Sequence, residues 1–79
     1  MRSKSDLFTY SASIYGMKCG MCESHINTAI RNKYKIKKVT SSRKKNLTKI
    51  ISFEEIKEND LIELITGLGY KIENVIKED

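Results

Sequence analysis

The sequence lacks any long apolar run. No stretch of its 79 residues approaches the roughly 20 consecutive apolar residues that a helix needs to span a bilayer. The first ten residues, MRSKSDLFTY, include basic side chains but no apolar segment after them, so we expect no secretory signal peptide. We therefore predict a protein without membrane insertion, and the cytoplasm as its default location.

Proline is absent, and no internal repeat, low-complexity tract or linker divides the chain. A chain of 79 residues can form one small domain with a modest core. We predict a single domain over residues 1–79, with its core at about 8–76. So short a chain has little room for a substrate cleft beside a catalytic apparatus, so we expect that it is not an enzyme.

Cysteine and histidine are also scarce. Both cysteines and the only histidine lie in one stretch, IYGMKCGMCESHI, at residues 14–26. Two thiols two residues apart could form a disulfide, half of a zinc site, a redox couple or an open site for a soft metal. In a cytosolic protein such a CxxC pair is more often metal-binding or redox-active than a structural disulfide.

Acidic residues are missing from the middle of the chain. Between Arg31 and Lys49 there are nine basic residues and no acid, whereas from Ile50 onward there are eight acids and only three lysines. Such a basic segment is either a solvated face or a docking surface for an acidic protein or a nucleic acid.

Hydrophobic periodicity predicts six elements. Apolar side chains alternate from Phe8 to Ile14, which indicates a half-buried strand ending at Gly16. Two further strands are predicted at 36–41 and 47–53, separated by the polar turn SSRKKN at 41–46, and a last strand at 70–76. Helical spacing predicts a helix from about 21 to 32 and a second one that begins with Asn59 as its N-cap and ends at Gly67 and Gly69.

Within these elements, some faces can be assigned. The last strand should point three side chains inward: Tyr70, Ile72 and either Val75 or Ile76. The third strand carries Ile50 on one face. The opposite face of the third strand carries Leu47, Lys49, Ile51 and Phe53. The element order βαββαβ predicts an α+β fold of the ferredoxin-like class, with two helices on one face of a four-stranded antiparallel sheet.

The predicted position of the thiols suits metal binding. Cys22 should lie in the first turn of a helix, where unpaired N–H groups and the positive end of the helix dipole favour a thiolate. Lys18 adds a positive charge, and Gly20 is expected to let the loop turn tightly so that the sulfurs converge. Two thiolates without another obvious ligand form a soft, low-coordinate site that selects Cu(I) and would also hold Hg(II).

The other side chains near the thiols have weaker claims as ligands. Glu23 and His25 are the candidates that zinc would need, since zinc takes three or four protein ligands. A lone histidine on a helix surface more often faces water. Met17 is expected to pack beneath the loop, and Met21, between the cysteines, is expected to be exposed.

The segment GMKCGMC, followed by Ile26, Ala29 and Ile30, resembles the GMxCxxC motif of heavy-metal-associated domains. This family comprises small copper chaperones, the N-terminal modules of heavy-metal P-type ATPases and mercury-binding relatives. The resemblance covers about residues 8–76, and LGY at 68–70 matches the family's Gly-aromatic signal. It implies Cys19 and Cys22 as the metal ligands, Met17 as a buried support and Tyr70 close to the site.

The chain also departs from that family. The stretch NKYKIKKVTSSRKKN lacks the usual Gly-Val after the first helix and is far more basic, which leaves the register of the second strand open. Zinc-preferring relatives often carry an acid just before the first cysteine, where this chain has Lys18. That difference argues against zinc, although Glu23 keeps zinc among the alternatives.

Two readings without a metal compete. CGMC at a helix start mimics a redox site, but thioredoxin-like folds are longer and place a cis-proline against their cysteines, and this chain has no proline. RNA-recognition modules share the βαββαβ order, but they display aromatic residues on their central strands to stack bases. Here Phe8 and Tyr10 alternate with Ser and Thr in a way that should bury them under the helices.

The sequence therefore predicts a carrier of soft metal ions that uses Cys19 and Cys22. Cu(I) is the favoured cargo, with Zn, Cd or Hg handling as the alternative and a basic nucleic-acid-binding domain as the alternative without a metal. The expected partner is a metal-transporting P-type ATPase or another thiol-bearing acceptor protein, and no specific nucleic acid. We expect a monomer, with a metal-bridged dimer as a further form.

Overall fold

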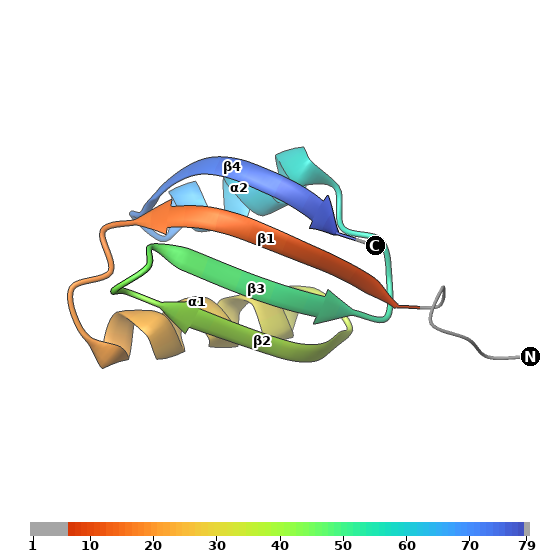
Figure 1. Cartoon of the computed structure of the whole chain (residues 1–79), viewed down its shortest axis with the longest axis horizontal. Helices are drawn as coiled ribbons and strands as arrows, with labels where there is room; N and C mark the ends of the chain where they lie inside the picture. The colour runs from red at the N-terminus through yellow and green to blue at the C-terminus, as the bar shows by residue number, and fades with distance from the viewer. Residues whose placement is uncertain (1–6, 79) are drawn as a thin grey trace, which may run out of the picture.

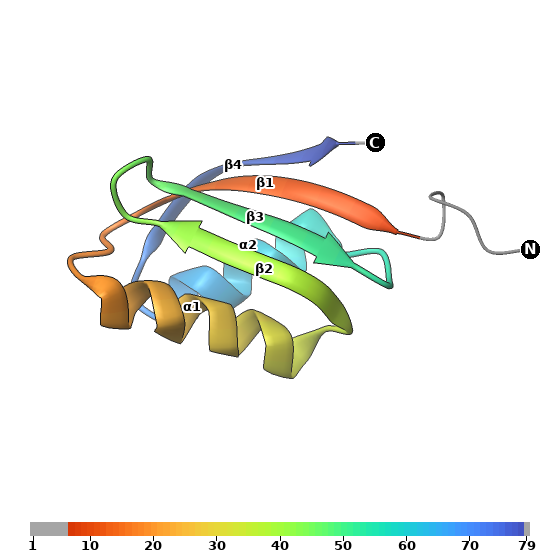
Figure 2. The ribbon, with the colours of Figure 1, turned by 60° about the horizontal axis from the view of Figure 1, so that its bottom comes forward.

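The computed structural model describes residues 7–78, and over that range it confirms the βαββαβ order. The elements are β1 (Phe8–Tyr15), α1 (Gly20–Lys33), β2 (Ile36–Ser42), β3 (Leu47–Ser52), α2 (Glu58–Gly67) and β4 (Lys71–Glu78). The strands form one antiparallel sheet in the order β2-β3-β1-β4. Both helices cover the same face of this sheet (Figures 1 and 2). The signal-peptide prediction falls largely on residues 1–6, outside the described residues.

Strand β1 runs through the centre of the sheet and supplies much of the core. Its alternating residues Tyr10, Ala12 and Ile14 are buried under the helices, as the sequence predicts. The Tyr10 hydroxyl accepts a hydrogen bond from the backbone N–H of Ile56 at 3.0 Å, which fixes the chain ahead of α2. The strand ends before Gly16, whose φ of +103° is a conformation that glycine adopts without steric cost. These contacts anchor the loop that carries the cysteines.

The two edge strands each contain an irregularity that resets which side chains face inward. In β2 the pairing with β3 shifts between Ile36 and Lys38, and the buried residue is Val39. In β4 the pairing with β1 shifts so that Ile72 and Val75, three residues apart, both pack against the core. Ile76 is 58% exposed. An extra residue in one strand of a pair breaks the period of two, which explains why strict alternation does not identify these residues.

The core-facing side of β3 is more polar than its sequence suggests. The face that carries Ile50 is the inward one, and Thr48 and Ser52 flank Ile50 there and are fully buried. The Thr48 hydroxyl lies 2.9 Å from that of Ser41, and the Ser52 hydroxyl donates to the Glu54 carbonyl at 2.6 Å. Buried hydroxyls with hydrogen-bond partners are tolerated in a core.

Helix α2 begins earlier than predicted. Asn59 is not the N-cap, because the helix starts at Glu58 with Lys57 as the capping residue and no side-chain cap bond. Ile56, just before the cap, and Leu61, in the next turn, are both buried in the core. An apolar pair at these two positions fixes the entry of a helix and here outweighs the capping preference of asparagine. The helix ends at Gly67, and Gly69 has a φ of +99°, in agreement with the predicted stop.

Three connections lie together at one end of the domain. They are the β1–α1 loop, the β2–β3 turn and the α2–β4 connection (Figure 1). The C-terminus of β4 lies at the opposite end of the domain (Figure 1). Within residues 7–78, neither helix is long and apolar enough to cross a membrane. The fold therefore brings the cysteine loop, the basic turn and the segment before β4 to one place.

Candidate metal centre

The two cysteines lie at the N-terminal end of α1. Cys19 is the N-cap residue with an extended backbone, and its carbonyl accepts the N–H groups of Cys22 at 3.1 Å and Glu23 at 3.4 Å. Cys19 is exposed, Cys22 is half-buried, and neither forms a disulfide. The helix has 14 residues, so its N-terminus presents unpaired N–H groups and a favourable dipole to negative charge near the thiols.

The tight turn of the loop depends on a different glycine from the one expected. Gly20 is the first residue of α1 and does not have a positive φ, whereas Gly16 does. A Cβ at Gly16 would also lie 3.5 Å from the Tyr70 ring. That separation is an ordinary van der Waals contact, so it is the left-handed turn after β1 that requires glycine at position 16.

Tyr70 contributes directly to the chemistry of the site. Its hydroxyl forms a hydrogen bond with the Cys22 thiol, and this bond is the main cause that lowers the pKa of Cys22 from 9.0 to about 7. A hydrogen bond from the Lys18 backbone lowers the pKa further, desolvation opposes this, and hydrogen bonds with the Cys19 backbone and side chain add smaller lowering effects. The same contact raises the pKa of the Tyr70 phenol. The lowered pKa makes the thiolate form of Cys22, which is the form that binds metal, accessible near neutral pH.

The neighbouring methionines and histidine lie as the sequence predicts. Met17 is buried in the core beneath the loop, and Met21 is 82% exposed. His25 is exposed and contacts Tyr70 in an edge-to-face arrangement, with 6.4 Å between ring centroids. Met17 therefore supports the loop through packing, and the His25 ring lies against the aromatic residue that holds Cys22.

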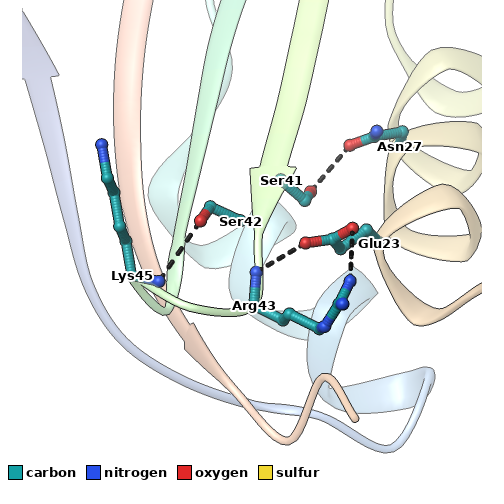
Figure 3. A network of polar contacts seen from close by, with 6 residues as sticks. All are labelled: Glu23, Asn27, Ser41, Ser42, Arg43 and Lys45. Atoms are coloured by element: carbon teal, nitrogen blue, oxygen red, sulfur yellow. Dashed lines mark hydrogen bonds and ion pairs between the residues drawn. The ribbon is translucent and has the colours of Figure 1, made fainter. Parts of the chain in front are cut away.

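Glu23 is engaged by the β2–β3 turn (Figure 3). Its carboxylate accepts the backbone N–H of Arg43 at 2.7 Å, and its second oxygen lies 3.4 Å from the Arg43 guanidinium. In the described part of the chain, no group of three or more His, Cys, Asp or Glu side chains is placed to hold a metal ion. Cys19 and Cys22 lie three positions apart at the start of α1. The structure does not place Glu23 or His25 with them in a group of three possible metal ligands.

Arg43 is the site residue that sequence reasoning did not single out. The sequence places it in a polar turn, twenty residues from Glu23, as one basic residue among nine. Only the antiparallel pairing of β2 with β3 brings this turn to the start of α1. The sequence indicated this contact only by containing both an acid in the first turn of α1 and a basic turn between β2 and β3.

Comparison with family models gave no match, and comparison with curated proteins gave no relative. Among solved structures, a copper binding domain from the P-type ATPase HMA7 is 21% identical, with a TM-score of 0.78, and the alignment covers 91% of this chain and 99% of that one. The yeast copper transporter domain Ccc2a is 22% identical with a TM-score of 0.79 and the same coverages.

The N-terminal domain of ZntA in its Zn(II) form is also similar, at 18% identity and a TM-score of 0.74, with 84% of this chain and 89% of that chain covered. The structural neighbours thus include domains that bind copper and a domain that binds zinc. The likeness extends over nearly the whole length of each neighbour. This chain has the fold of the heavy-metal-associated domains of P-type ATPases and metal chaperones.

Proposed function

We propose that this protein binds a soft metal ion, Cu(I), between Cys19 and Cys22 and transfers it to a thiol-bearing acceptor. The observation that carries the proposal is the state of the Cys22 thiol: the pKa is lowered to about 7 by Tyr70 and the loop backbone. A thiol prepared as thiolate, beside a second accessible thiol on the same loop, is a soft donor pair. Thiolates select Cu(I) over harder divalent ions.

The exposure of the site supports transfer rather than permanent storage. Cys19 is exposed and Cys22 half-exposed, so a partner's thiol can approach the bound ion without unfolding of the domain. Exchange through a three-coordinate intermediate needs space for one further sulfur, and an open loop provides it. On this proposal the protein carries its cargo and performs no turnover chemistry.

The position of the basic turn supports docking to an acidic partner. Lys44 and Lys45 lie in the β2–β3 turn, at the same end of the domain as the cysteine loop (Figure 1). Lys37 and Lys38 are at the beginning of β2 and therefore at its other end. Charge placed beside a transfer site steers a partner of opposite sign and mainly raises the association rate. The acceptor on this proposal is a domain of a metal-transporting P-type ATPase, or another thiol protein, with an acidic surface.

The test is a competition titration of the reduced protein under anaerobic conditions. Cu(I) and Zn(II) are each titrated against a chelator of known affinity, with the variant C19S/C22S as the matched control. The proposal expects one Cu(I) per protein, lost in the variant, and much weaker Zn(II) binding. Zn(II) bound as tightly as Cu(I) would favour zinc or cadmium handling, and no metal retained against the chelator would refute metal binding altogether.

A further inference from the structure

The Glu23 carboxylate comes from the first turn of α1, beside the proposed metal ligands in the chain. Glu23 follows Cys22 directly and lies four residues after Cys19, the N-cap residue, whose carbonyl accepts the Glu23 backbone N–H at 3.4 Å. One of its oxygens is 3.9 Å from the point where a Cβ on Gly20 would stand, next to Cys19. A carboxylate oxygen is a good third ligand for Zn(II), whereas Cu(I) prefers sulfur. A free Glu23 would therefore favour zinc.

Glu23 is not free, because both of its carboxylate oxygens face Arg43. One accepts the Arg43 backbone N–H at 2.7 Å, and the other lies 3.4 Å from the guanidinium (Figure 3). The Glu23 side chain is only 23% exposed. The Arg43 side chain is 43% exposed and its guanidinium contact is long, so the short bond from the backbone N–H is the stronger of the two.

The turn that carries Arg43 is itself tied to α1 by a second contact. The Ser41 hydroxyl donates to the Asn27 side-chain carbonyl at 2.7 Å, one helical turn beyond Glu23. The Thr48 hydroxyl, from β3, lies 2.9 Å from that of Ser41. These bonds hold the end of β2 against the helix, so Arg43 meets Glu23 in a fixed geometry (Figure 3).

We propose that Arg43 withholds the Glu23 carboxylate from a metal ion bound at Cys19 and Cys22 and so makes the site selective against Zn(II). This inference rests on the proposed function. For zinc to gain Glu23 as a third ligand, the carboxylate must leave a backbone N–H and a guanidinium at once. Cu(I), satisfied by two thiolates, does not need it. The β2–β3 turn thus reduces the affinity for Zn(II) of a metal site on the β1–α1 loop.

Two substitutions at Arg43 separate its two contacts with Glu23. R43A removes the guanidinium and keeps the backbone N–H, whereas R43P removes both. Proline needs a φ near −65° and an extended residue before it; Arg43 is not among the residues with a positive φ, and it follows Ser42, the last residue of an extended strand. K49A is the matched control, since it removes one positive charge from the adjacent strand β3 without touching Glu23.

The measurement is the Zn(II) dissociation constant of each reduced variant, by competition with a chelator, together with the Cu(I) dissociation constant. From the strengths of such contacts we expect R43P to tighten Zn(II) binding about tenfold and R43A about threefold. K49A should leave it within about twofold, and Cu(I) binding should change in none of the three. In 13C-labelled R43P, the Glu23 carboxyl resonance should shift on addition of Zn(II), and in the wild type it should not.

The variant E23Q/R43P decides whether Glu23 is the cause. The proposal expects the tightening to disappear in this double variant. It is wrong if the tightening persists there, since the effect would then be one of charge alone. It is also wrong if E23Q by itself weakens Zn(II) binding tenfold or more, or if folded R43P and R43A both bind Zn(II) like the wild type. If R43P does not fold, R43A and its pair with E23Q decide the question in the same way. Loss of all metal binding in wild type would instead refute the proposed function.

Discussion

The substitution Tyr70→Phe tests the origin of the reactive thiol. It removes one hydroxyl and leaves the ring that packs near Gly16 and His25. Because the Tyr70 hydrogen bond is the largest cause of the lowered pKa of Cys22, the pKa should rise from about 7 toward 9.0. A thiol with a pKa of 7 is about half ionised at pH 7, whereas one with a pKa of 9 is about 1% ionised. The remaining backbone hydrogen bonds place the variant between these limits.

The assay is the pH dependence of alkylation of Cys22, measured in a C19S background so that one thiol reacts. The midpoint of the rate profile should lie near pH 7 when Tyr70 is present and clearly higher in C19S/Y70F. Tyr15, a partly exposed tyrosine at the end of β1, supplies the control Y15F, which should not move the midpoint. A midpoint that stays near 7 in C19S/Y70F would refute the role given to the Tyr70 hydroxyl.

Three further predictions follow from the same structure. The pKa of Cys22 is lower in the folded state than in the unfolded state, so the Cys22 thiolate stabilises the folded protein fully above pH 9. This stabilisation is lost as the pH falls through 7. The melting temperature of the metal-free protein should therefore rise between pH 7 and pH 9 more in the wild type than in C22S. Ile30→Ala, at a fully buried position of α1, should lower the free energy of unfolding by about 2–5 kcal/mol in urea denaturation; a loss below about 1 kcal/mol would contradict the packing described. Reversal of charge in K44E/K45E should slow association with an acidic partner and weaken the salt dependence of the association rate. K37E/K38E, at the far end of β2, should slow association less. If both double variants slowed association equally, the β2–β3 turn would not be the docking surface.

The sequence predicts the element order because its signals are local and strong. The alternation in β1 predicts the burial of Tyr10 correctly and that of Phe8 in part, since Phe8 is only partly buried, and helical spacing places both helices. The motif around the cysteines adds the position of the thiols at a helix start. These features depend only on how apolar side chains are spaced along one strand or helix, so they can be predicted from the sequence.

The remaining features depend on contacts between elements. The irregularities in β2 and β4 come from pairing with their neighbours, and they bring Val39 and Val75 inward against strict alternation. The start of α2 is set by burial of Ile56 and not by a cap. The engagement of Glu23 by Arg43 needs the hairpin to fold back onto α1. None of these contacts leaves a periodic trace in the sequence.

X-ray absorption spectroscopy of the Cu(I)-loaded protein tests the proposed binding of Cu(I) by two thiolates, because it identifies the atoms bound to the metal. We expect only sulfur atoms bound to the copper, two per copper ion, and no bound copper in C19S/C22S. A nitrogen or oxygen atom in the first shell, or copper retained by the variant without thiols, would contradict binding through Cys19 and Cys22.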